Sequence, residues 1–276
     1  MKYRHAFHAG NFADVHKHVT LLALLKALQR KDKGFLYLET HAGRGAYDLS
    51  HAAESEKGVA RFSTAATSSE ELRLYATRLN EYREQQGNPH AYPGSPLLAA
   101  SELRPQDRAV LIELVPAEAR ALERAITRKS RVHVEQGDGF ERLRAWLPPA
   151  ERRGLTFIDP PYEETAKDFQ RVTTAIAAAL SRFRTGVIAA WYPVKDEREI
   201  AAWQTHLARD LECEVLVAEL WLYPRDSRVA LNGSGLLIVN PPYLFADRMR
   251  VWLPELRAML DAGEAGGTSI RPLAHA

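Results

Sequence analysis

The sequence predicts an α/β protein built on a doubly wound, mostly parallel sheet. Short apolar runs of strand length alternate with helix-length amphipathic segments, and this alternation places helices on both faces of a parallel sheet. The composition agrees with a folded protein. Of the 276 residues, 46% are hydrophobic and 26% are charged, which excludes the disordered and fibrous classes.

The first predicted helix covers residues 11–30, with Asn11 and Asp14 as a cap pair at its start. Its apolar stripe consists of Val15, Val19, Leu22, Leu25 and Leu28. The predicted strands are 35–40, 109–115, 132–134, 155–158, 186–191, 214–222 and 236–239. The predicted helices that alternate with them are 116–126, 140–147, 163–184, 197–207 and 247–260.

A polar helical segment, residues 54–88, interrupts this alternation. Ser68–Glu71 has the spacing of a capping box, and Gly87-Asn88-Pro89 marks the end of the helix. The face of this helix that is expected to pack consists of Leu72, Tyr75, Leu79 and Tyr82. At the other end of the chain, residues 262–276 are expected to fray.

Ligands of doubly wound sheets bind beyond the carboxyl ends of the strands, so the residues at those ends are the candidates for chemistry. The turn 41–45 after the first strand has two glycines but lacks the glycine spacing of dinucleotide sites and the Lys-Ser/Thr pair of phosphate loops. Pyrophosphate binding is therefore disfavoured. Glu113 ends the next strand, where a carboxylate can accept from both hydroxyls of a ribose or can simply be solvated. Asp138-Gly139 follows the third strand.

Asp159-Pro160-Pro161-Tyr162 follows the strand 155–158 and is the most informative segment. Because the prolines fix the backbone, the Asp159 carboxylate and the Pro160 carbonyl can face one point, and two acceptors suit an exocyclic amino group. Tyr162 would offer an aromatic face to a base taken out of its stack. The alternative for this segment is a proline-rich turn. A second copy, Asn240-Pro241-Pro242-Tyr243, ends a late strand, and we expect it to be only a turn against the helix 247–260.

Together these segments resemble bacterial 23S ribosomal RNA (adenine-N6)-methyltransferases of the RlmJ type, the enzymes specific for adenine 2030. The resemblance is carried by residues 3–15, Lys17, His18 and the blocks 35–43, 92–96, 137–139, 158–162, 233–235 and 240–243. It implies a Rossmann-like methyltransferase domain, residues 1–53 and 89–276, with a small helical insertion, residues 54–88.

The resemblance also implies a cofactor, S-adenosylmethionine, and a substrate, 23S rRNA. Glu113 would hold the cofactor ribose, Asp138 its adenine amino group, and the turn 41–43 its amino-acid end. The implied cofactor residues are His18, His41, Gly43, Ser95, Glu113, Asp138, Gly139 and Asp159. The implied catalytic residues are Asp159, Pro160 and Tyr162. The residues expected near the RNA are Tyr3, Arg4, His5 and Lys17.

The first 31 residues carry six Lys or Arg side chains and one acid, Asp14, which favours a patch that faces RNA phosphates. The alternative is a solvated helix face, since the whole chain has a formal net charge of only +2. The nearby histidines lack cysteine partners and carboxylates at metal spacing, so no metal is expected.

Two other function classes share some of these features. A DNA (adenine-N6)-methyltransferase would share the Asp-Pro-Pro-Tyr segment, but no additional recognition domain is visible. A nonenzymatic RNA-binding module would avoid acids such as Asp159 and Glu113, because RNA phosphates repel them. The single cysteine, Cys213, and the absence of a signal peptide or an apolar run of membrane-spanning length lead us to expect a cytoplasmic protein. We also expect a monomer.

Overall fold

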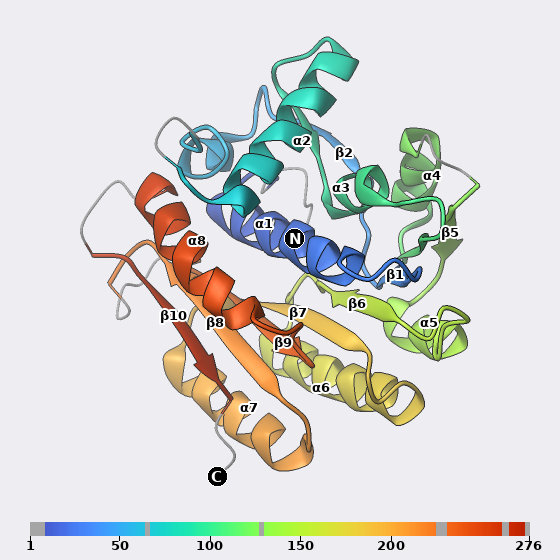
Figure 1. Cartoon of the computed structure of the whole chain (residues 1–276). Coiled ribbons are helices and arrows are strands. Elements are labelled where there is room, and N and C mark those ends of the chain that lie inside the picture. The colour runs from blue at the N-terminus through green and yellow to red at the C-terminus, as the bar shows by residue number, and fades with distance from the viewer. Residues whose placement is uncertain (1–8, 64–66, 127–129, 225–230, 261–264, 274–276) are drawn as a thin grey trace.

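The computed structural model of the chain describes residues 9–63, 67–126, 130–224, 231–260 and 265–273 (Figure 1). Its centre is an eight-stranded sheet in the order β10-β8-β9-β7-β6-β1-β4-β5. These strands are β1 (Leu36–Glu39), β4 (Arg108–Glu113), β5 (Val132–Gln136), β6 (Gly154–Ile158), β7 (Val187–Val194), β8 (Val215–Trp221), β9 (Gly233–Val239) and β10 (Gly267–Pro272). Six of them run in one direction, and β9 and β10 run in the opposite direction, which confirms the mostly parallel sheet.

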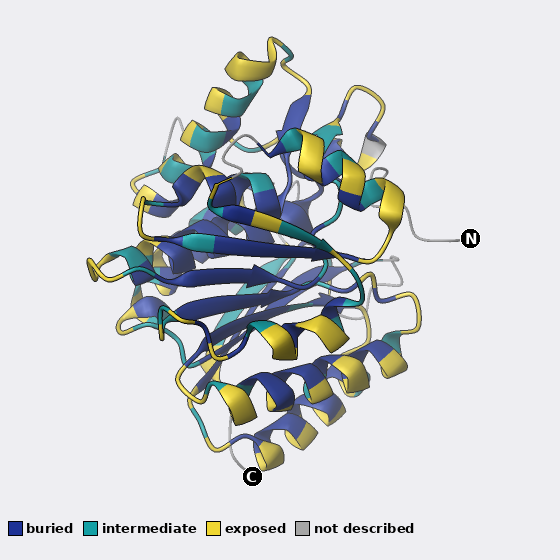
Figure 2. Ribbon diagram, turned by 90° about the vertical axis from the view of Figure 1, so that its right-hand side faces the viewer, coloured by how far each residue is buried: buried dark blue, intermediate teal, exposed yellow. Residues whose placement is uncertain are grey.

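Helices cover both faces of the sheet, so its strands are buried between two layers whose outer surfaces are exposed (Figures 1 and 2). One layer contains α5 (Gly139–Trp146), α6 (Thr165–Arg182) and α7 (Glu197–Asp210), which share one apolar core. The other layer contains α1 (Phe12–Gln29), α2 (Glu70–Gln86), α3 (Ser95–Glu102), α4 (Pro116–Ala125) and α8 (Phe245–Leu260). The doubly wound architecture is therefore confirmed.

Helix α1 is buried on nearly every side. The Asn11 side chain accepts from the backbone N–H of Asp14 at 2.9 Å, and the Asp14 carboxylate accepts from the N–H of Gly10 at 3.0 Å, so the predicted cap pair is confirmed. The predicted single stripe is too narrow, because α1 lies between the sheet, α2, α3 and α8. The polar residues His16, Lys17 and His18 are consequently buried as well.

The connection from β1 to β4 carries the insertion. This connection contains the antiparallel strand pair β2 (Ala46–Asp48) and β3 (Ala91–Pro93), a 3₁₀ turn (Ala53–Lys57), and α2 and α3. Helix α2 ends at Gly87 in a left-handed conformation, as predicted. The expected capping box is wrong, because the N-cap residue is Ser69 and its side chain makes no cap bond. The Ser69 hydroxyl donates instead to Glu255 of α8, at 2.7 Å.

The C-terminal segment does not fray throughout, contrary to expectation. Residues Gly267–Pro272 form β10, which pairs antiparallel with β8 and closes that end of the sheet.

The pairing of β7 with β9 determines which residues lie near the candidate site. Because β9 runs antiparallel to β7, residues 233–235 at its start lie at the edge where β6 and β7 end, and Asn240 lies at the opposite edge.

Candidate active site

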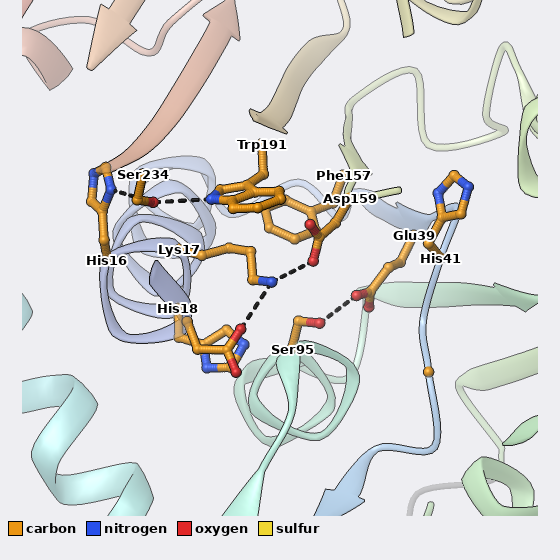
Figure 3. A network of polar contacts seen from close by, with 12 residues as sticks. His16, Lys17, His18, Glu39, His41, Ser95, Phe157, Asp159, Trp191 and Ser234 are labelled. Carbon is orange, nitrogen blue, oxygen red and sulfur yellow. Dashed lines mark hydrogen bonds and ion pairs between the residues drawn. The ribbon is translucent and has the colours of Figure 1, made fainter. Parts of the chain in front are cut away.

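The candidate site lies where the order of the strands reverses. From β1 the chain continues to β4 and β5 on one side and later to β6 and β7 on the other, so the ends of β1 and β6 meet at the position where sheets of this kind bind ligands. Glu39 ends β1, and Asp159 directly follows β6. The structure therefore brings together the two segments that the sequence analysis singled out (Figure 3).

Lys17 contacts Asp159 directly. Its ammonium group pairs with Oδ2 of Asp159 and lies 3.0 Å from Oδ1 of Asp14. It also lies 5.3 Å from the centre of the Trp191 ring, close enough for a cation–π contact. Only 4% of Lys17 is exposed, so the expectation that it belongs to an open, phosphate-facing patch is wrong. Burial beside two carboxylates places Lys17 in the candidate site.

Tyr162 does not present an open ring face. It is 4% exposed, its hydroxyl donates to the Trp191 carbonyl at 2.7 Å, and its ring packs edge-on against Phe169. Its φ of +50° lies in the left-handed region, which is uncommon for a bulky residue and is typical of constrained functional turns. Tyr162 thus fixes the turn that carries Asp159. The ring beside Lys17 and Asp159 is that of Trp191, a half-buried residue that the sequence analysis missed (Figure 3).

The Trp191 side chain is positioned by hydrogen bonds that lead through Ser234 to His16. Its indole N–H donates to the Ser234 hydroxyl at 2.9 Å, and Ser234 also contacts Nδ1 of His16 at 2.9 Å. Burial lowers the pKa of His16 to about 3, so this imidazole is neutral near pH 7. Ser234 lies between two glycines, which let β9 lie close to the side chains of β7. A Cβ at Gly235 would lie 2.2 Å from the Tyr192 ring.

Glu39 is a second acid that the sequence analysis left without a role. It is fully buried, and it accepts from the hydroxyls of Tyr37, at 2.9 Å, and Ser95. Burial, with a smaller contribution from Asp159, raises the pKa of Glu39 to about 8, against the opposing effects of the two hydroxyl bonds and of Lys17. The acid after β1 therefore holds Ser95, one of the implied cofactor residues.

Glu113 lies at the end of β4 with both carboxylate oxygens engaged. One accepts from the N–H of Gly43 at 2.8 Å and the other from the N–H of Val115 at 2.7 Å. Burial raises its pKa, and the two backbone bonds oppose the rise. Each oxygen keeps a second lone pair, so Glu113 can still accept from two hydroxyl groups. Leu114 and Val115 beside it are 59% and 48% exposed and offer an apolar wall.

Asp138 and Gly139 begin α5 next to the end of β1. The Asp138 carboxylate accepts from the N–H of Phe140 at 2.9 Å and pairs with Arg171 at 2.7 Å. Glycine is required at 139, because a Cβ would lie 1.9 Å from the Thr40 carbonyl oxygen. The His41 ring packs edge-on against Phe140 at 4.7 Å, and burial lowers the pKa of His41 to about 4.

His18 lies deeper than the other implied cofactor residues. It is 1% exposed, and its Nδ1 contacts the Tyr92 hydroxyl at 2.9 Å. Tyr3, Arg4 and His5 lie outside the described residues. Of the remaining basic residues in the N-terminal segment, Lys26 pairs with Glu102, whereas Arg30 and Lys31 follow the far end of α1, about 20 Å from Lys17 at 1.5 Å per residue. The described members therefore do not form a single basic patch.

The second Pro-Pro-Tyr segment lies at the opposite edge of the sheet from Asp159. The Asn240 amide donates to the carbonyls of Arg184 and Gly186, both at 2.9 Å, and Tyr243 is 84% exposed. The two copies also differ in backbone: Tyr162 is left-handed in the first, whereas Asn240 and Leu244 are left-handed at the second. Asn240 thus belongs to a turn, but its side chain ties that turn to the segment before β7 and not, as expected, to the helix 247–260.

Within the described residues, no group of three His, Cys, Asp or Glu side chains is arranged to hold a metal ion. In the same part of the chain, no helix is both long and apolar enough to cross a membrane.

Comparison with known proteins identifies the family. The model of the family described as "Ribosomal RNA large subunit methyltransferase D, RlmJ" matches residues 32–272. This chain belongs to the RlmJ family. A relative from Escherichia coli K12, "Ribosomal RNA large subunit methyltransferase J", is 39% identical over 98% of both chains. A relative of the same name from Haemophilus influenzae is 38% identical over 94% of both chains.

A solved structure has the same fold. This RlmJ-family chain and a protein from Legionella pneumophila superpose with a TM-score of 0.87 at 36% identity, covering 96% and 98% of the two chains. Membership of the RlmJ family makes this chain a ribosomal RNA methyltransferase, built on the doubly wound sheet described above.

Proposed function

We propose that this protein transfers a methyl group from S-adenosylmethionine to the N6 amino group of an adenine in 23S rRNA, at the position equivalent to adenine 2030. The observation that carries the proposal is the Asp159-Pro160 acceptor pair at the strand-order reversal, beside cofactor-type strand ends. The RlmJ relatives, named as methyltransferases of large-subunit ribosomal RNA, support the choice of substrate.

The donor set fits a nucleoside cofactor with an amino-acid tail. Glu113 retains lone pairs for two ribose hydroxyls, with Leu114 and Val115 as an apolar wall for the base. Asp138 would receive the base amino group, and Arg171 holds that carboxylate in place. His18, His41, Gly43, Ser95 and Gly139 would border the rest of the cofactor. The bound cofactor supplies an electrophilic methyl group on a sulfonium.

The chain's own residues prepare the acceptor nitrogen. The lone pair of an adenine amino group is delocalised into the ring, and hydrogen bonds to Asp159 and the Pro160 carbonyl would localise it. In the described part of the chain, Pro160 O accepts no other hydrogen bond, and Lys17 holds Oδ2 of Asp159. Asp159 would then accept the proton that the amino group loses. Tyr162 positions this turn, and Trp191 offers the aromatic surface for the base.

Methyl transfer by purified variants tests the proposal. Asp159→Ala is expected to lower single-turnover methylation of unmodified 23S rRNA at least about a hundredfold, the lower range for a positioned acid–base group. The fold should survive, because Lys17 keeps Asp14 as a partner. Nuclease digestion should yield N6-methyladenosine from the wild-type reaction. Equal methylation of duplex DNA, or an Asp159→Ala variant as active as wild type, would contradict the proposal.

A further inference from the structure

A cavity outside the site just described lies between the antiparallel strand pair β2–β3 and the C-terminal end of α2. Its volume is about 430 Å³, within the range of small-molecule sites. The side chains that give it chemical character are Arg44, Tyr47, Asp48, Tyr82, Gln86 and Asn88. Two alanines, Ala46 and Ala91, also line it and leave the space open.

The lining suits a nucleotide. Tyr82 is half-buried and contributes an aromatic surface of the kind on which bases stack. Hydrogen bonds from Ser50 and Asn88 lower the pKa of Asp48, so its carboxylate is an ionised acceptor for base amino and imino groups. Arg44 has 42% of its side chain exposed, and in the described part of the chain its acidic partner is Glu118, at 3.4 Å. Its guanidinium can therefore also contact a phosphate.

The cavity adjoins the active-site turn. Arg44 directly follows Gly43, whose N–H binds Glu113. Tyr47 lines the cavity, and its hydroxyl lies 2.7 Å from the point where a Cβ on Gly43 would be. A ligand in this cavity would therefore contact the same turn, 43–47, that borders the proposed cofactor site, without contacting Asp159 or Lys17.

We propose that this cavity binds one nucleotide of the RNA that carries the target adenine, with its base against Tyr82 and its phosphate at Arg44. The inference rests on the proposed function and assigns a substrate-binding role to the insertion. A nucleotide inside an RNA strand presents a single charge per phosphate, which one arginine matches. Free nucleoside diphosphates and triphosphates carry more charge and are usually held by glycine-rich loops or several cations, which this cavity lacks among its lining residues.

Two matched pairs of variants test the inference on unmodified 23S rRNA. Tyr82→Leu is expected to weaken RNA binding about tenfold, whereas Tyr82→Phe, which keeps the ring, should bind like wild type. Tyr243→Leu is the control, because Tyr243 is exposed at the far edge of the sheet. Arg44→Gln should reduce the salt dependence of RNA binding by about one unit of slope. Arg120→Gln, on the exposed side of α4, should leave the slope unchanged.

The affinity for S-adenosylmethionine should be the same in Tyr82→Leu and wild type. Cross-linking of 4-thiouridine-substituted RNA should label a peptide that contains Tyr82. RNA affinity unchanged in both Tyr82→Leu and Arg44→Gln, with wild-type methylation intact, would overturn the cavity assignment and leave the proposed function standing. Adenosine or guanosine monophosphate that binds without RNA and depends on Tyr82 would also overturn it, in favour of a free nucleotide. Failure of the wild type to methylate any RNA would instead contradict the proposed function.

Discussion

The Lys17 ammonium group forms ion pairs with two carboxylates. Asp14 lies at the start of the same helix, and Asp159 follows β6. A buried cation with two acidic partners orients both acids, and after the loss of one acid the cation still has the other as its partner. Asp14 is itself bonded to the N–H of Gly10, so the cap of α1 and the proposed reaction centre form one connected unit.

Glu113→Ala tests the proposed ribose contact. The variant loses a charged acceptor, so the affinity for S-adenosylmethionine should fall by about 2 kcal/mol, roughly thirtyfold. Isothermal titration calorimetry in the absence of RNA measures the dissociation constant for S-adenosylmethionine. A thermal melt of the variant is the control for folding. An unchanged dissociation constant in a folded variant would remove Glu113 from the cofactor site.

Glu39→Gln tests the buried acid at the end of β1. The folded-state pKa of about 8 lies above the ordinary 4.5, so Glu39 contributes stability that is complete below about pH 4.5 and is lost as the pH rises through 8. A glutamine keeps the shape without the titration. As the pH rises from about 5 to 8, the free energy of unfolding of the wild type should therefore fall relative to that of the variant. Urea titrations at several pH values measure this difference. A difference that is constant with pH would show that Glu39 is ionised in the folded protein.

Sequence reasoning reached part of this site and missed the rest for identifiable reasons. Strand-end acids such as Asp159 and Glu113 are visible because the residues that follow an apolar run can be read directly. Trp191 and Ser234 come together only through the pairing of β7 with β9, which no local pattern encodes. The burial of Tyr162 follows from a left-handed backbone that its residue type does not favour.

At the scale of elements, α2 and α8 are joined through one carboxylate. Glu255 on α8 accepts from the hydroxyls of Thr67, at 2.6 Å, and Ser69, at 2.7 Å, just before α2 begins. Arg248 on the same helix pairs with Glu71 at 2.8 Å. These contacts explain why the expected capping box failed: the hydroxyl groups are used between helices instead of within one.

Glu255→Ala should therefore loosen the insertion more than it destabilises the sheet. We expect a loss of about 1 kcal/mol in stability, the usual effect of partly exposed hydrogen bonds. Hydrogen exchange followed by mass spectrometry should show faster exchange in α2 than in β1 or β6. Glu255→Gln, which can still accept from the hydroxyls, serves as the partial control. Uniformly faster exchange throughout the chain would indicate that α2 and the sheet unfold together.

The elements themselves were largely predictable, since amphipathic and apolar runs of sufficient length identify helices and strands. The short elements were not: β2 and β3 have three residues each, and β10 follows the last predicted helix in a segment without an apolar run. Each of these strands depends on a partner that is remote in sequence or adjacent only across a long loop. Local pattern cannot specify such pairings.

At the scale of the whole molecule, strand direction separates two segments that are nearly identical in sequence. Asp159 follows β6 and lies at the edge where the parallel strands end, whereas Asn240 follows the antiparallel β9 and lies at the opposite edge. β10 follows Asn240 in the chain and joins the sheet, so a late position in the sequence does not distinguish the two segments. Strand direction does distinguish them, and it supports a reacting role for Asp159 and a structural role for Asn240.

Asn240→Ala should affect stability and leave catalysis unchanged. The variant loses two hydrogen bonds to carbonyls and a residue that tolerates a left-handed backbone, so we expect a loss of about 1–2 kcal/mol in the free energy of unfolding. Single-turnover methylation at saturating substrates should match wild type at a temperature well below the melting point. A folded Asn240→Ala variant without activity would place the reaction at the opposite edge of the sheet.

The burial of α1 on all sides has a consequence for how the protein is made. This helix leaves the ribosome well before two of its covering partners, β9 and α8, are synthesised, and Ser234, which contacts His16, follows it by 218 residues. At about 5–20 residues per second, its apolar surface stays without those partners for ten seconds or more. We therefore expect the apolar surface of α1 to favour chaperone binding during translation, until β9 has been inserted beside β7.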